Sequence, residues 1–150
     1  MILRDENGNK KEQHFSLSDD GDFVAIVNVE DVTGDALLEI QTDNGAFESL
    51  LISKEDVERT VVKQKEIDVQ LIEKGQSYTI NYILFESNSS KLKESSKIVL
   101  DGFSDWLIRN KKLNIEIQGH TDDVGPSKAN LALSMDRSFS VMEYLLEKGI

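Results

Sequence analysis

The chain has 150 residues, a formal net charge of −11 and a hydrophobic fraction of 39%, which is enough apolar content for a globular core. It contains no cysteine, which excludes a disulfide framework and a cysteine-ligated zinc site. Its uninterrupted apolar runs are only a few residues long and cannot span a bilayer. Residues 1–6 also lack the character of a signal peptide.

The negative charge lies mainly in the first half of the sequence. Residues 1–75 carry 8 Lys/Arg against 18 Asp/Glu, whereas residues 76–150 carry 9 against 10. A surface as acidic as that of the first half repels phosphate backbones and anionic lipid head groups. We therefore expect no nucleic-acid partner, and contact with a membrane only through segments outside this sequence.

The first half is predicted to consist of short strands. Four stretches rich in β-branched and apolar residues, separated by turn residues, cover 22–30, 36–42, 47–53 and 60–72. They predict a small, antiparallel, β-sandwich-like domain over residues 1–75, and we expect the sandwich to be partial. The acidic turn at 19–22 has residue types that suit calcium, but no downstream glutamate completes a calcium loop, so we interpret it as a plain turn.

Strands and helices alternate after residue 75. The pattern predicts strands over 78–85 and 113–118 and helices over 93–110 and 128–147. The fold class is therefore α+β, with a β-α-β-α domain over residues 76–150. Its two strands are expected side by side and parallel, joined by a right-handed crossover through the first helix. That helix has one apolar face, formed by Val99, Phe103, Trp106 and Leu107.

The second helix has an apolar stripe with a polar line beside it. Pro126 precedes this helix, and Ser127 is expected to cap it. The stripe consists of Leu131, Met135, Phe139, Met142, Leu145 and Leu146. Asn130, Ser134 and Arg137 follow one another at helical spacing along one flank of the stripe, so each is expected to be half-buried.

A half-buried arginine needs a partner, and the turn before the helix offers Asp122. The two side chains can form a structural ion pair, which is the commoner arrangement. Alternatively, they can form the two halves of a site for a zwitterion. In that case the guanidinium holds a carboxylate through two parallel hydrogen bonds, and the aspartate accepts from an ammonium group.

The order of residues in this region resembles the peptidoglycan-binding domain of the OmpA-like family, which also includes flagellar stator anchors. The resemblance extends upstream to the segment 83–92, which is similar to the first strand and following loop of the family. The matching residues are Gly119, His120, Thr121, Asp122, Gly125, Asn130, Leu133, Ser134, Arg137, Val141, Tyr144, Leu145 and Gly149.

The resemblance implies a ligand and a role for five residues. The family binds the diaminopimelate of the peptidoglycan stem peptide, whose free end bears an ammonium and a carboxylate on one carbon. By motif position Asp122 takes the ammonium and Arg137 the carboxylate, while Thr121, Asn130 and Ser134 shape the loop and pocket. The implied function is non-enzymatic anchoring of an envelope protein to the cell wall, in the periplasm or at the outer membrane, without metal or cofactor.

The sequence also departs from the family pattern. The family domain continues with a further strand, a helix and a final strand, whereas residues 149–150 end this sequence. We therefore expect a domain truncated at its C-terminus that exposes part of the stripe around Leu131, Met135 and Phe139. The first half resembles a carboxypeptidase-regulatory-like β-sandwich through the turn at 20–23 followed by a strand.

Two other classes of function remain as alternatives. His120, Asp122 and Asp123 have the residue types of a metal-dependent hydrolase. However, the sequence holds one other histidine, His14, and no nucleophile elbow, phosphate loop or His-Glu-x-x-His helix. The second alternative is a purely structural interaction module in which Asp122 and Arg137 neutralise each other.

Overall fold

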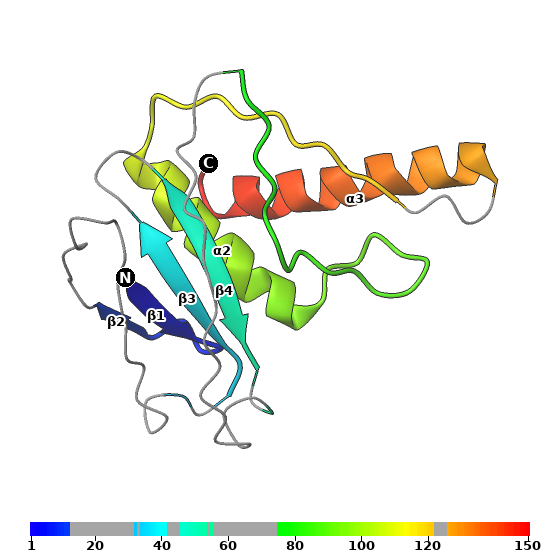
Figure 1. Cartoon of the computed structure of the whole chain (residues 1–150). Coiled ribbons are helices and arrows are strands. Elements are labelled where there is room, and N and C mark those ends of the chain that lie inside the picture. The colour runs from blue at the N-terminus through cyan, green and yellow to red at the C-terminus, as the bar shows by residue number, and fades with distance from the viewer. Residues whose placement is uncertain (13–31, 33, 42–45, 54, 56–74, 122–125) are drawn as a thin grey trace, which may run out of the picture. The chain divides into compact units, whose positions relative to one another are not determined.

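The computed structural model describes residues 1–12, 32, 34–41, 46–53, 55, 75–121 and 126–150 (Figure 1). They belong to two compact units, Met1–Asn81 and Tyr82–Ile150, which are described separately. An antiparallel sheet in the first unit and two helices in the second confirm the α+β class. Among the described residues, no helix has the length and apolar character needed to cross a membrane.

The first unit contains one four-stranded antiparallel sheet with the strand order β2-β1-β3-β4 (Figure 1). The strands are β1 (Ile2–Asp5), β2 (Lys10–Glu12), β3 (Ala36–Gln41) and β4 (Phe47–Ile52). The strands predicted over 36–42 and 47–53 are confirmed as β3 and β4. Those predicted over 22–30 and 60–72, and the acidic turn at 19–22, lie outside the described residues.

Strand β3 is central and is buried on both faces of the sheet. Its Ala36 and Leu38 pack with Leu3 and Val32 in an apolar cluster. On the opposite face Glu39 is fully buried, and its carboxylate Oε1 lies 2.7 Å from Nε of Arg4. Burial of a charged group is costly unless the group is paired. The ion pair therefore allows Arg4 and Glu39 to be buried in the sheet.

The hairpin β1–β2 was not predicted from the sequence. Its turn is organised by Asp5, whose carboxylate Oδ1 accepts hydrogen bonds from the backbone N–H groups of Asn7 (2.9 Å) and Asn9 (2.8 Å). Gly8 supplies the left-handed backbone, with φ of 83°. The Asn-Gly dipeptide between two short strands is a known hairpin signal.

The second unit contains helix α2 (Glu94–Arg109) and helix α3 (Ser127–Glu147), which confirm the two predicted helices. The predicted apolar face of α2 is buried, and the rings of Phe103 and Trp106 stack with centroids 5.7 Å apart. The expected capping by Ser127 is wrong. Pro126 occupies the N-cap and Ser127 is the first helical residue, so its hydroxyl makes no capping hydrogen bond.

The C-terminal turns of α3 are tied to α2 through one carboxylate. The hydroxyl of Tyr144 donates to Oδ1 of Asp101 (2.9 Å), and Nζ of Lys148 lies 2.6 Å from the same oxygen. Burial and the hydrogen bond to Asp101 raise the pKa of Tyr144, and the hydrogen bond to Asp101 raises the pKa of Lys148. These contacts fix the C-terminal end of α3 to α2.

The β-α-β-α prediction is wrong in its strands. Residues 75–121 are all described, and they contain no β-strand; the bridge between Phe85 and Leu92 is the one β pairing in this range. Segments 78–85 and 113–118 therefore do not form a parallel pair. Strand assignment requires a ladder of hydrogen bonds to a neighbouring strand, and apart from the single bridge at Phe85 neither segment has such pairing among the described residues.

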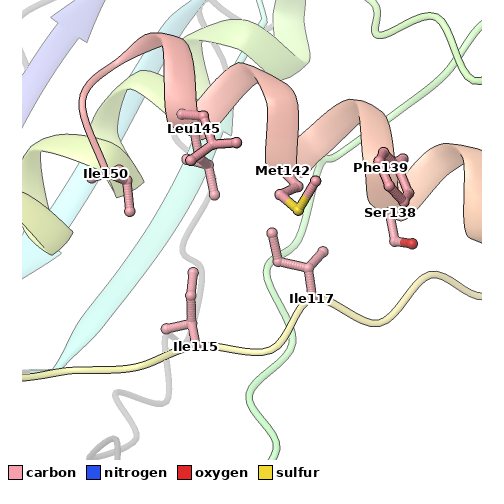
Figure 2. A pocket seen from close by; sticks show the side chains of 8 residues that line it. Ile115, Ile117, Ser138, Phe139, Met142, Leu145 and Ile150 are labelled. Carbon is pink, nitrogen blue, oxygen red and sulfur yellow. The ribbon is translucent and has the colours of Figure 1, made fainter.

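Segment 113–118 contacts α3 through side chains instead of a ladder. Figure 2 shows Ile115 and Ile117 opposite Met142 and Leu145 of α3, across an apolar groove of about 340 Å³. The two isoleucines of the segment therefore face the same groove. The groove is lined by Ile115, Ile117, Ser138, Phe139, Met142, Leu145, Leu146 and Ile150.

Candidate functional site

Arg137 lies in the middle of α3 and is half-buried, as predicted. Its Nε donates a hydrogen bond to the backbone carbonyl of Ser89 (3.1 Å). The centre of its guanidinium lies 5.0 Å from the ring centroid of Phe85, within the range of a cation–π contact. The terminal nitrogens Nη1 and Nη2 make no hydrogen bond to any residue that the structure describes.

The partners of Arg137 belong to a short loop between residues 85 and 92. The loop is closed by the bridge between Phe85 and Leu92 and by the hydrogen bond from Glu86 N to Lys91 O (2.9 Å). Asn88 adopts a left-handed backbone with φ of 48°, which asparagine tolerates better than most residues. This turn places Ser89 so that its carbonyl can accept from Arg137.

Helix α2 holds the start of this loop through a single buried hydroxyl. Ser96 is fully buried; its Oγ accepts from the backbone N–H of Leu84 (2.7 Å) and donates to the carbonyl of the same residue (2.8 Å). The N–H of Lys93 also donates to the Leu84 carbonyl (3.0 Å). Phe85, the next residue along the chain, is thereby fixed relative to α2.

Gly119 allows the segment before the site to approach α3 closely. A Cβ added to Gly119 would overlap the backbone carbonyl oxygen of Ser134 and would lie 3.3 Å from the backbone nitrogen of Ser138. Only glycine fits such a close approach without a shift of one backbone. Thr121, half-buried two residues further along, is therefore held near the middle of α3.

The other predicted site residues are placed as follows. Asn130 and Ser134 are half-buried on the same flank of α3 as Arg137, as predicted. The hydroxyl of Ser134 donates within the helix to the carbonyl of Leu131 (2.8 Å). Asp122 lies outside the described residues, so its predicted proximity to Arg137 stays a prediction.

The residues of the hydrolase alternative are only partly described. His120 is exposed at the end of segment 113–120, and Asp122 and Asp123 lie outside the described residues. Within the described part of the chain no three His, Cys, Asp or Glu side chains are close enough to hold a metal ion.

The geometry around Arg137 is suited to binding an anion. Its described neighbours, a carbonyl and an aromatic ring, orient the guanidinium without neutralising its positive charge. Two parallel N–H groups on Nη1 and Nη2 match the spacing of carboxylate oxygens. The Nη1 and Nη2 groups of Arg137 can therefore hold a carboxylate.

Sequence reasoning missed the contribution of Phe85, Ser89 and Ser96 to this site. Spacing along α3 identified Arg137, but its partners lie 48 and 52 positions earlier in the chain. No periodicity connects positions so far apart. The available signal was the run 83–92, whose resemblance to a known loop was recognised without a role for any of its residues.

The fold and site together define the class of the second unit. Residues 84–150 match the OmpA family and form a domain of that family. The matched range begins just before the loop that holds Arg137 and includes both helices.

Relatives of this domain have names that refer to the bacterial cell wall or outer membrane. The chain is 31% identical over 78 residues to the "Peptidoglycan-associated lipoprotein" of Rhizobium meliloti, covering 50% of this chain and 44% of the relative. It is 39% identical over 70 residues to the "Outer membrane protein A" of Serratia odorifera, covering 45% of this chain and 29% of the relative. It is 29% identical over 68 residues to the "Outer membrane porin F" of Pseudomonas fluorescens, covering 45% of this chain and 21% of the relative.

The matched region is less than half the length of each of these relatives. No solved structure matches the chain. The family match lies within the second unit.

Proposed function

We propose that the protein binds peptidoglycan non-covalently and anchors an envelope protein to the cell wall, in the periplasm or at the outer membrane. The observation that carries the proposal is the half-buried Arg137, whose Nη1 and Nη2 have no hydrogen-bond partner among the described residues, within an OmpA family domain. Relatives named peptidoglycan-associated lipoprotein and outer membrane protein A support the wall as the partner.

The proposed ligand is the diaminopimelate of the stem peptide. Its free end carries a carboxylate and an ammonium on one carbon, so recognition requires a cation and an anion side by side. Arg137 is proposed to hold the carboxylate through Nη1 and Nη2, and Asp122 to accept from the ammonium. Neither group alone would select a zwitterion over a simple ion.

Thr121, Asn130 and Ser134 are proposed to shape the pocket around these two groups. Asn130 and Ser134 share the flank of α3 with Arg137. Thr121 follows Gly119 by two residues, and Gly119 approaches the Ser134 backbone of the same helix. The function requires binding and no bond breaking, so no cofactor or metal is proposed.

A sedimentation assay with purified peptidoglycan sacculi tests the proposal. The protein should co-sediment with sacculi, and free diaminopimelate should release it. Release by diaminopimelate but not by cadaverine, which keeps the two ammonium groups and lacks both carboxylates, would support recognition of a carboxylate and an ammonium on one carbon. Absence of co-sedimentation, or release of soluble muropeptides that indicates hydrolysis, would contradict the proposal.

A further inference from the structure

The guanidinium of Arg137 offers two faces for a bidentate hydrogen bond. One is the side formed by Nε and the adjacent Nη, and the other is the end formed by Nη1 and Nη2. In this structure Nε already donates to the Ser89 carbonyl at 3.1 Å. The side-on geometry is therefore blocked by a backbone group of the protein itself.

The aromatic ring of Phe85 restrains the same group from a different direction. The guanidinium lies over this ring, 5.0 Å from its centroid. The hydrogen bond from Nε to Ser89 and the contact of the guanidinium with the ring together restrict the orientation of the planar group. Arginine otherwise loses considerable rotamer freedom when it is held in one geometry.

We propose that Phe85 and the Ser89 carbonyl are positioning groups that present Nη1 and Nη2 of Arg137 end-on to the ligand carboxylate. The inference rests on the proposed function, because it concerns how that function achieves its geometry. Phe85 and Ser89 need not touch the ligand. Their role is to hold the arginine in its binding orientation before the ligand arrives, which lowers the entropic cost of binding.

The rigidity of this arrangement comes from α2. Ser96 holds both backbone groups of Leu84, the residue before Phe85, and the bridge to Leu92 closes the loop that carries Ser89. Helix α3 supplies the arginine, and a loop anchored on α2 supplies its restraints. The orientation of the binding group thus depends on two elements that are separate in the sequence.

Substitution of Phe85 separates positioning from simple packing. Phe85→Leu removes the ring but keeps an apolar side chain, whereas Phe85→Tyr keeps the ring. Phe139→Leu is the matched control, because Phe139 is 58% exposed on the same helix as Arg137 but lines the apolar groove. Affinity for purified sacculi should fall by about 3- to 30-fold for Phe85→Leu, the range that corresponds to loss of one cation–π contact. Phe85→Tyr and Phe139→Leu should bind like the parent.

Nuclear magnetic resonance of the arginine side chain tests the geometry without relying on a variant that folds. In the parent protein the Arg137 side-chain protons should be shifted upfield by the Phe85 ring current, and Hε should exchange slowly. Diaminopimelate should slow exchange of the Nη protons and leave the Hε signal in place. In Phe85→Leu the upfield shift should disappear.

The outcomes distinguish this inference from the proposed function. If the parent does not bind sacculi, the proposed function fails, whatever the arginine resonances show. If the parent binds and Arg137→Ala does not, but folded Phe85→Leu binds like the parent, the function stands and the positioning role is overturned. Rapid exchange of Hε and unshifted side-chain protons in the parent would overturn it as well.

Discussion

Two arginines show how differently the two units accommodate a positive charge. In the sheet, Arg4 is 4% exposed and its partner Glu39 is fully buried, with 2.7 Å between Nε and Oε1. In the helical unit, Arg137 is half-buried, and the described groups nearest to it are an uncharged carbonyl and an aromatic ring. One positive charge is neutralised inside the fold, and the other is oriented but not neutralised by the described residues.

This difference fits a structural role for Arg4 and the proposed binding role for Arg137. A buried ion pair contributes to the folded state only as long as both partners are present. A cation held by neutral groups at the surface keeps its electrostatic attraction for an external anion. Substitutions at the two sites should therefore affect different measurements, stability in the first case and ligand affinity in the second.

The largest effect on stability is expected for Glu39→Gln. This change removes the negative charge that lies 2.7 Å from Nε of the buried Arg4, which should lower the free energy of unfolding by about 3 to 5 kcal/mol. Urea denaturation followed by circular dichroism measures the loss. Glu12→Gln is the control, because Glu12 is an exposed carboxylate in β2 of the same sheet. Equal stability of the two variants would show that the Arg4–Glu39 pair is not required.

The complementary expectation is that Arg137→Ala loses binding and keeps stability. Removal of the carboxylate-binding group should weaken sacculus binding by about 2 to 4 kcal/mol, as for other desolvated charged hydrogen bonds. Asp122→Ala should have a similar effect. Arg137→Lys should restore only part of the affinity, since an ammonium cannot form the bidentate pair.

The matched control for this series is Lys128→Ala. Lys128 is exposed in the first turn of α3, so this variant removes a positive charge from the same helix without touching the site. It should bind sacculi like the parent and melt at the same temperature. Undiminished binding by folded Arg137→Ala, measured beside this control, would show that Arg137 does not hold the ligand.

A smaller effect is expected for Gly119→Ala, and it should appear in both measurements. The added Cβ overlaps the Ser134 carbonyl, so segment 113–121 or α3 must shift, at a cost of about 1 to 3 kcal/mol in stability. The shift also moves Thr121 relative to Arg137, so sacculus affinity should fall too. Parent-like melting and binding would mean that the approach of the two backbones is looser than the structure shows.

The smallest effect is expected at the Tyr144–Asp101 contact. Tyr144→Phe removes one hydrogen bond and should cost about 1 kcal/mol at neutral pH. The pKa values of Tyr144 and Lys148 are both raised in the folded state. Each group therefore contributes stability that is present below its unfolded pKa of 10.0 or 10.5 and is lost as the pH rises through the folded value.

Urea denaturation between pH 7 and pH 11 tests whether stability falls as the pH rises. The parent should lose stability above about pH 10, and Tyr144→Phe should start lower and decline less steeply. Burial, together with the charge of Glu48, also raises the pKa of Tyr78 in the first unit, so part of the decline should persist in Tyr144→Phe. A steeper decline in the variant than in the parent would contradict the assignment.

The sequence predicted the helices better than the strands. Helical spacing of apolar residues is a local signal. It located both ends of α2 and of α3 to within one residue and gave the buried face of α2. A strand forms only when a neighbouring strand pairs with it. The residues of segments 78–85 and 113–118 do not by themselves show whether such a neighbour is present. The hairpin β1–β2 was missed although Asn7-Gly8 is a turn signal, because its strands are very short.

The sequence identified the principal arginine of the candidate site but not the residues that hold this arginine in place. Arg137 was found because it falls on a polar line beside an apolar stripe, and its half-burial is confirmed. Its contacts with Phe85 and Ser89 depend on a loop that folds back from α2. Only the three-dimensional arrangement brings these residues together, and the place of Asp122 beside them remains a prediction.

The Arg4–Glu39 pair also bears on the order in which the sheet forms. Strands β1 and β2 are close in sequence, as are β3 and β4, so each pair can close quickly as a hairpin. Joining β1 to β3 requires closure between residues 35 positions apart, which is slower. A slip of one residue at that step would turn Arg4 to the other face of the sheet, away from Glu39. The ion pair therefore favours the correct register of β1 against β3.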